Sequence, residues 1–140
     1  MLTTLQNLYT DYAATALEVR KKARFFDGFF GLGKDPRNDI CHETFYNAVG
    51  KWVEEFLASQ PEQETLMAAA TYILETPKAY FGQECYWFMF AAHGHLKPMI
   101  SLLSKENSAE LGRRMDATYH KRDRMPLQKE LLKLLAAAAK

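Results

Sequence analysis

The stretch YFGQECYWFMFAAHGHLKPMISLL, from Tyr80 to Leu103, holds the longest apolar run of the chain and two of its four histidines. Within it, the residues from Cys85 to Ala92 are all apolar, so no side of this segment is polar and neighbouring elements must enclose it. A short apolar run fits a buried strand as well as a buried helix. No other segment offers a strand partner, and a lone strand leaves its backbone groups unpaired. The stretch therefore predicts a central, aromatic-rich helix.

Apolar residues recur at three- and four-residue spacing in the rest of the chain, which predicts further helices. Thr76-Pro77 is expected to open the central helix, Asn107 with Glu110 to cap a later one, and Pro126 to begin the last. The residues expected to face the core in the first three and the last of these helices are Leu5, Tyr9, Tyr12, Cys41, Phe45, Val49, Trp52, Phe56, Leu66, Ala70, Ile73, Leu74, Leu127, Leu131, Leu134 and Leu135. We expect an all-α fold, a compact single-domain array of about six to seven helices over residues 1–140.

Composition describes an ordinary globular chain without a strong electrostatic field. Of its 140 residues, 48% are hydrophobic and 25% are charged, and the formal net charge is +1. This balance disfavours disorder, and it gives no general attraction for nucleic acid or anionic membranes. Cys41 and Cys85 lie in apolar surroundings that are typical of reduced thiols. No segment resembles a signal peptide or a membrane span, so we expect a soluble, cytoplasmic protein without a membrane partner.

The candidate site consists of histidines and charged residues from two short segments. The weak catalytic candidates are His42, Glu43, His93 and His95, and the weak ligand-binding candidates in the glycine-containing loop are Lys34, Asp35, Arg37 and Asp39. If both segments form one polar mouth, Arg37 and Lys34 could hold a small anionic ligand while a histidine or Glu43 transfers a proton. The structural alternative is that the aspartates cap a helix, the basic residues face water, and the two later histidines bind a helix C-terminus as imidazolium.

Three classes of function follow from these patterns. The catalytic set is incomplete, and neither His-x-x-x-His nor Cys-x-x-Cys occurs, so we predict no metal site and no cofactor. A protein-interaction or scaffold module is favoured over an enzyme. Phe29, Phe30 and Leu32 in the loop could cover a hydrophobic groove or mark an oligomer contact. The first alternative is a small-ligand-binding or metal-dependent enzyme with a cleft lined by His and Glu. The second, a nucleic-acid-associated helical protein, is disfavoured by the mixed charges.

Overall fold

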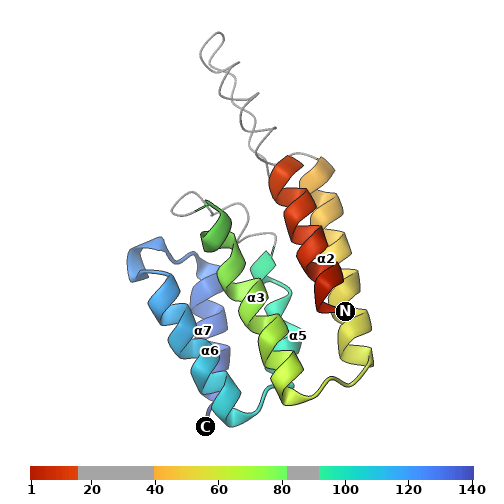
Figure 1. Ribbon diagram of the computed structural model, residues 1–140. Helices are drawn as coiled ribbons and strands as arrows, with labels where there is room; N and C mark the ends of the chain where they lie inside the picture. The colour runs from red at the N-terminus through yellow and green to blue at the C-terminus, as the bar shows by residue number, and fades with distance from the viewer. Residues whose placement is uncertain (16–39, 82–91) are drawn as a thin grey trace. The chain divides into compact units, whose positions relative to one another are not determined.

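The computed structural model describes residues 1–15, 40–81 and 92–140, and throughout these ranges the regular structure is helical (Figure 1). The helices are an N-terminal helix over residues 2–15, α2 (Ile40–Ala58), α3 (Gln63–Phe81), α5 (Leu96–Ile100), α6 (Lys105–Thr118), the 3-10 helix η3 (Lys121–Asp123) and α7 (Pro126–Ala138). The prediction of an all-α fold is confirmed. The aromatic segment from Gly82 to Ala91 lies outside the described residues, so the central position given to it stays a prediction.

The chain divides into two compact units, Met1–Glu54 and Glu55–Lys140, here called the N-terminal and C-terminal units. The prediction of a single domain over residues 1–140 stays a prediction, since each unit is described by itself.

The N-terminal unit pairs the first helix with α2. Tyr9, Tyr12 and Phe45 form an aromatic core in which the Tyr12 and Phe45 rings stack at 4.2 Å between centroids and Tyr9 meets Phe45 edge-on at 5.1 Å. Leu5, Val49 and Trp52 are buried as the helical spacing predicted. The Trp52 Nε1–H donates to the Met1 carbonyl at 2.9 Å, while Tyr12 stacks on Phe45, so the two helices run antiparallel.

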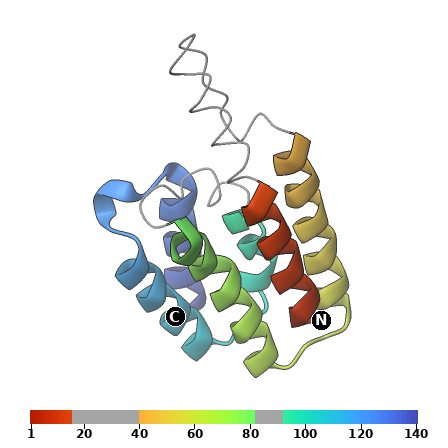
Figure 2. The same ribbon diagram turned by 45° about the horizontal axis from the view of Figure 1, so that its top comes forward.

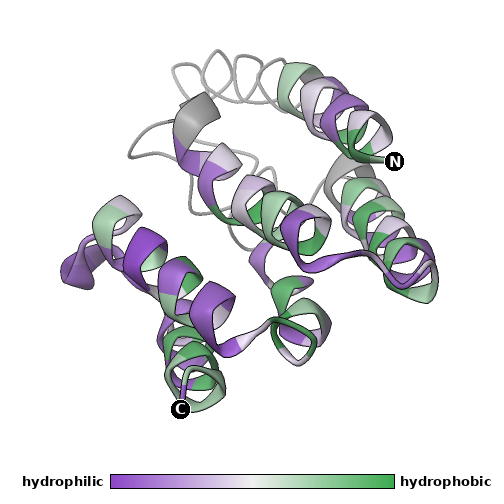
Figure 3. Ribbon diagram, turned by 60° about the horizontal axis from the view of Figure 1, so that its bottom comes forward, coloured by the Kyte–Doolittle hydropathy of each residue, from purple (hydrophilic) through white to green (hydrophobic). Residues whose placement is uncertain are grey.

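Among the described residues of the C-terminal unit, the α-helices α3, α5, α6 and α7 pack against one another. In it α3 packs against α5 and α6, and α7 packs against the same two helices. Figures 1 and 2 show α3, α6 and α7 lying side by side. The residues that are enclosed between them include Leu66, Ala70, Ile73, Leu74, Leu96, Met99, Leu111, Met115, Leu131 and Leu135. In α6 the buried residues are Ser108, Leu111 and Met115, while Arg113 and Arg114 are exposed, so this helix is amphipathic (Figure 3).

Pro77 lies inside α3 and does not begin a new helix, so that prediction is wrong. A proline within a helix removes one backbone donor, here the one that would reach the Ile73 carbonyl. The apolar residues on either side keep one helical spacing across Thr76 and Pro77, both of which are buried. Burial of this face outweighs the cost of the missing hydrogen bond.

Two further corrections concern helix ends and exposure. Ser104 and not Asn107 caps α6, because the Ser104 hydroxyl accepts from the Asn107 amide at 3.1 Å. The cap lies three residues earlier than the sequence pattern suggested. Leu134 in α7 was expected to dock but is 39% exposed, whereas Gln128 on the same helix is fully buried. In α7, therefore, a glutamine is enclosed in the core and Leu134 is not.

Candidate functional site

Most of the predicted polar mouth lies outside the described residues. Lys34, Asp35, Arg37 and Asp39 are outside them altogether, and His42 belongs to α2 but its side chain is not described. Glu43 is exposed in the first turn of α2. A shared cleft between these residues and the later histidines therefore stays a prediction.

His93 is helical and its side chain is completely buried in the C-terminal unit. Its Nε2 lies 3.0 Å from the Leu74 carbonyl of α3 and its Nδ1 lies 3.0 Å from the Gln128 amide nitrogen of α7. The Tyr119 ring meets the imidazole edge-on at 5.3 Å, and the Tyr119 hydroxyl donates to the same Leu74 carbonyl at 2.5 Å. His93 thus connects α3, the end of α6 and α7.

The tautomer of His93 follows from its partners. A carbonyl can only accept, so the proton is on Nε2 and is donated to Leu74. Nδ1 must then accept from the Gln128 amide N–H. The orientation of that amide is fixed in turn, because its oxygen accepts from the Met125 backbone N–H at 3.1 Å at the start of α7.

Burial in this apolar interior lowers the pKa of His93 from 6.5 to about 4, although the hydrogen bond to Leu74 opposes the shift. The ring is therefore neutral at pH 7. The expectation that it would be an imidazolium held by a helix C-terminus is wrong, because the carbonyl that it contacts belongs to another helix and the ring is out of reach of water.

His95 lies two residues further on and has a different environment. It is half-buried at the N-cap position of α5, where its side chain makes no capping hydrogen bond. It shares the Gly94 corner with His93. The two histidines therefore differ in exposure, since His93 is completely buried and His95 is half-buried.

Cationic side chains hold the end of α6 beside the His93 cluster. The Lys78 ammonium of α3 donates to the Thr118 carbonyl, and Arg124 donates to the Tyr119 carbonyl at 3.1 Å. Arg124 also pairs with Asp116 at 2.7 Å. Positive groups at a helix C-terminus are favourable because they satisfy its last carbonyls. They fix the position from which Tyr119 reaches Leu74.

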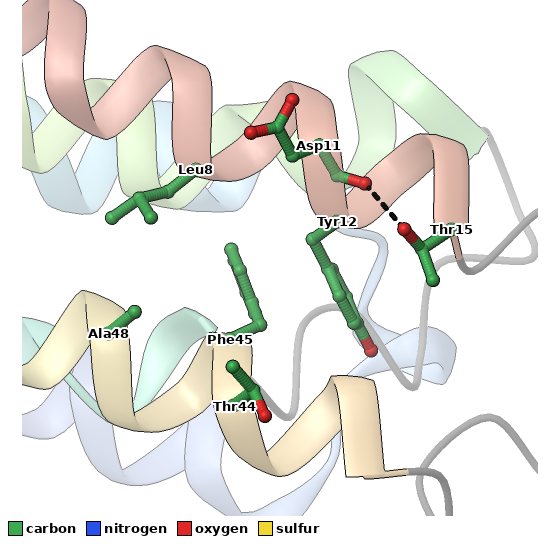
Figure 4. Close-up of a pocket in the computed structure, with 7 residues that line it drawn as sticks. All are labelled: Leu8, Asp11, Tyr12, Thr15, Thr44, Phe45 and Ala48. Atoms are coloured by element: carbon green, nitrogen blue, oxygen red, sulfur yellow. Dashed lines mark hydrogen bonds between the residues drawn. The ribbon is translucent and has the colours of Figure 1, made fainter.

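A separate groove of about 230 Å³ lies on the N-terminal unit, between the first helix and α2 (Figure 4). Its described lining residues are Leu8, Asp11, Tyr12, Thr15, Thr44, Phe45 and Ala48. The Phe45 ring stands between the two helices, and the Asp11 carboxylate points away from α2 at the rim. Leu8, Ala48 and the two rings give it an apolar interior.

The groove exists because small and large side chains face each other across the helix pair. Ala48 is only half-buried and does not fill the space opposite Leu8, while the Tyr12 and Phe45 rings close the floor on one side. Thr15 donates its hydroxyl to the Asp11 backbone carbonyl at 3.0 Å, within its own helix. Asp11 is the one charged residue among the described lining residues.

Comparisons of the chain with protein families, with curated proteins and with solved structures give no match. Among the described residues, no group of three or more His, Cys, Asp or Glu is placed to hold a metal ion. No helix in those same ranges has the length and apolarity that crossing a bilayer requires. The cytoplasmic location stays a prediction.

Sequence reasoning missed both the Gln128 contact and the groove. Gln128 follows Pro126 by two positions, and a proline at the first helical position with Gln at the third is half of a capping box. That signal predicts the bond to Met125. The groove has no such signal, because its volume depends on how far apart the two helices pack.

Proposed function

We propose that this chain is a protein-interaction module, and that the groove of the N-terminal unit receives one large apolar side chain from a segment of a partner protein. The observation that supports this proposal is the groove itself, an apolar space between two helices with polar residues at its edge. Partner proteins commonly anchor themselves through one such side chain in a pocket.

The volume favours a side chain over a small-molecule substrate. Small-molecule sites usually measure about 300–1,000 Å³, and a cavity of about 150 Å³ holds a benzene ring. A groove of about 230 Å³ is therefore large enough for one aromatic or leucine side chain and small for a substrate with its cofactor. Its described lining residues include no histidine or cysteine, and Asp11 points away from α2 at the rim, so the apolar interior favours a binding role over the enzyme alternative at this position.

The charge at the rim of the groove suggests which residue lies next to the anchoring side chain in the partner segment. Asp11 is exposed at the rim and carries the charge of the described lining. A partner segment with a Lys or Arg next to its apolar anchor would place opposite charges together, which aids orientation more than affinity. An acidic partner segment would meet repulsion at the same rim.

A random-peptide selection against the full chain tests the proposal. We expect enriched peptides to carry an aromatic residue or leucine beside a basic residue. Ala48→Trp should fill the groove and weaken these peptides at least tenfold, because burial of a large apolar side chain contributes about 1.5–3 kcal/mol. Asp11→Asn should weaken them by less than tenfold.

The matched control is Ala14→Trp, an exposed alanine on the first helix that lies outside the described lining of the groove. It should leave peptide binding unchanged. Equal binding to Ala48→Trp and to the parent chain would refute the proposal. A concentration-dependent dimer that only Ala48→Trp disrupts would assign the groove to a second copy of the chain and would also overturn the proposed partner.

A further inference from the structure

We propose that His93 is an acid-sensitive lock on the start of α7, so that protonation of its ring releases the hydrogen bond that caps this helix. The inference concerns the C-terminal unit and is independent of the groove. Its basis is a chain of three hydrogen bonds, Met125 N–H to Gln128 Oε1, Gln128 N–H to His93 Nδ1, and His93 Nε2–H to the Leu74 carbonyl.

The direction of every bond in this chain is determined. The Met125 amide and the Leu74 carbonyl are backbone groups at its two ends, one a donor and one an acceptor. Between them, Gln128 and the neutral His93 ring each accept once and donate once. The chain therefore works with one tautomer of His93 and one orientation of the Gln128 amide.

Protonation at Nδ1 places an N–H opposite the Gln128 N–H, so two donors face each other at 3.0 Å. The Gln128 amide can rotate to turn its oxygen toward the ring, but this oxygen then leaves the Met125 N–H without its acceptor. Alternatively Gln128 moves away from the ring. The first route breaks the hydrogen bond that caps α7, and the second separates Gln128 from the ring. A charged ring that stayed fully enclosed would lack hydration, so protonation favours a state in which the start of α7 opens and water reaches the ring.

Charged side chains near the cluster are already engaged elsewhere within the described residues. Glu75 pairs with Arg114, Asp116 with Arg124, and Glu130 with Lys97. Lys78 donates to the Thr118 carbonyl. Lys129 is exposed next to Gln128, His95 is half-buried two residues along the chain, and Tyr119 already donates to Leu74. No carboxylate in these ranges contacts the imidazole, and among the described contacts the Leu74 carbonyl is the one that favours its charged form, against the larger effect of burial.

Amide hydrogen exchange on the full chain, measured residue by residue from pH 7.5 to 4.5, tests the lock. After correction for the intrinsic exchange rate, we expect the opening equilibrium at Met125 to rise about tenfold for each pH unit below about 6.5. Burial lowers the pKa of His93 to about 4, so this dependence should continue across the range. Amides in the middle of α3 should remain protected at pH values where Met125 opens.

Gln128→Glu is the decisive variant, because it replaces the amide that donates to His93 Nδ1 by a carboxylate that accepts from it. One carboxylate oxygen can accept from Met125 and the other from a protonated Nδ1, so the ring should be charged at pH 7, which its nitrogen chemical shifts would show. The acid-dependent rise in the opening equilibrium at Met125 should then disappear. His93→Asn should also remove the rise, since an amide does not titrate. The matched control is His120→Asn, an exposed histidine whose loss should leave the rise intact.

Three results would overturn the inference. The first is a rise in opening with acid that Gln128→Glu leaves unchanged, and the second is the loss of that rise in His120→Asn. The third is simultaneous opening of α3 and Met125 with the same pH dependence, because this would show that acid unfolds the whole unit. If His93→Asn does not fold, the exchange rates of Gln128→Glu still distinguish a lock at His93 from acid unfolding.

Discussion

Gln128→Leu should destabilise the chain more than Tyr119→Phe, another substitution that deletes hydrogen bonding in the His93 cluster. The substitution keeps a side chain of similar size at a fully buried position and removes both hydrogen bonds of the amide. It leaves His93 Nδ1 buried without a donor, which costs about 1–3 kcal/mol. It also removes the acceptor of the Met125 N–H, a loss of about 1 kcal/mol at a helix start. We expect about 2–4 kcal/mol in total.

Tyr119→Phe is the comparison that makes this magnitude informative. It also deletes a buried hydrogen bond, the one from the Tyr119 hydroxyl to the Leu74 carbonyl. That carbonyl keeps its second donor, the His93 Nε2–H, so no buried group is left unsatisfied. The expected cost is only about 1 kcal/mol, the net value of one hydrogen bond.

Urea denaturation of both variants, followed by far-UV circular dichroism and by exchange of α7 amides, measures the difference. With a slope of about 2 kcal/mol/M, Gln128→Leu should lower the midpoint by roughly 1–2 M and Tyr119→Phe by about half a molar. Equal midpoints for the two variants would refute the reasoning, because they would show that leaving His93 Nδ1 and the Met125 N–H without partners costs no more than losing one hydrogen bond.

Two further predictions concern helix packing in the same unit. Gly112→Ala should stabilise the chain by about 0.5–1 kcal/mol in thermal unfolding, because Gly112 lies within α6 and an added Cβ would meet its nearest side-chain atom at 3.9 Å, an ordinary contact distance. Leu131→Ala should cost about 2–5 kcal/mol in urea denaturation, whereas Leu134→Ala on the same helix should cost under about 1 kcal/mol, because the first leucine is fully buried and the second is 39% exposed. A similar cost for both leucines would show that α7 presents a different face to the core.

Helical spacing predicted the fold well where the core is apolar. Tyr9, Phe45 and Ile73 are buried as expected, and no described segment departs from helix and its connections. The periodicity works because a 3.6-residue repeat places such residues on one face whatever the partner helix is. It fails at Leu134, where the expected stripe was too broad and the choice of buried residue depended on the neighbours of α7.

Helix boundaries were less predictable, for a local reason. Thr76-Pro77 is typical of a helix start in isolation, yet the apolar residues before and after it share one face and keep α3 continuous. Ser104 and Asn107 are both good capping residues, and the choice between them depends on Gln63 of α3, whose side chain accepts from the Ser104 amide at 2.8 Å and donates to the Leu102 carbonyl at 2.8 Å. A contact across about forty residues cannot be predicted from a four-residue motif.

The candidate site shows why the identity of a residue was a poor guide to its role. His93 was singled out because histidine is the side chain that most often transfers protons near neutral pH. In the structure its ring is enclosed and lies within hydrogen-bond distance of Leu74 and Gln128, so its titration acts on the hydrogen bonds of α7 and a substrate has no access to it. The residues around the groove, mainly apolar and with two threonines, carry no chemical signature, yet their packing leaves open space of a definite size. The two proposals therefore depend on the volume of the groove and on the direction of the hydrogen bonds around His93. Both follow from the arrangement of the helices, which a sequence pattern does not determine.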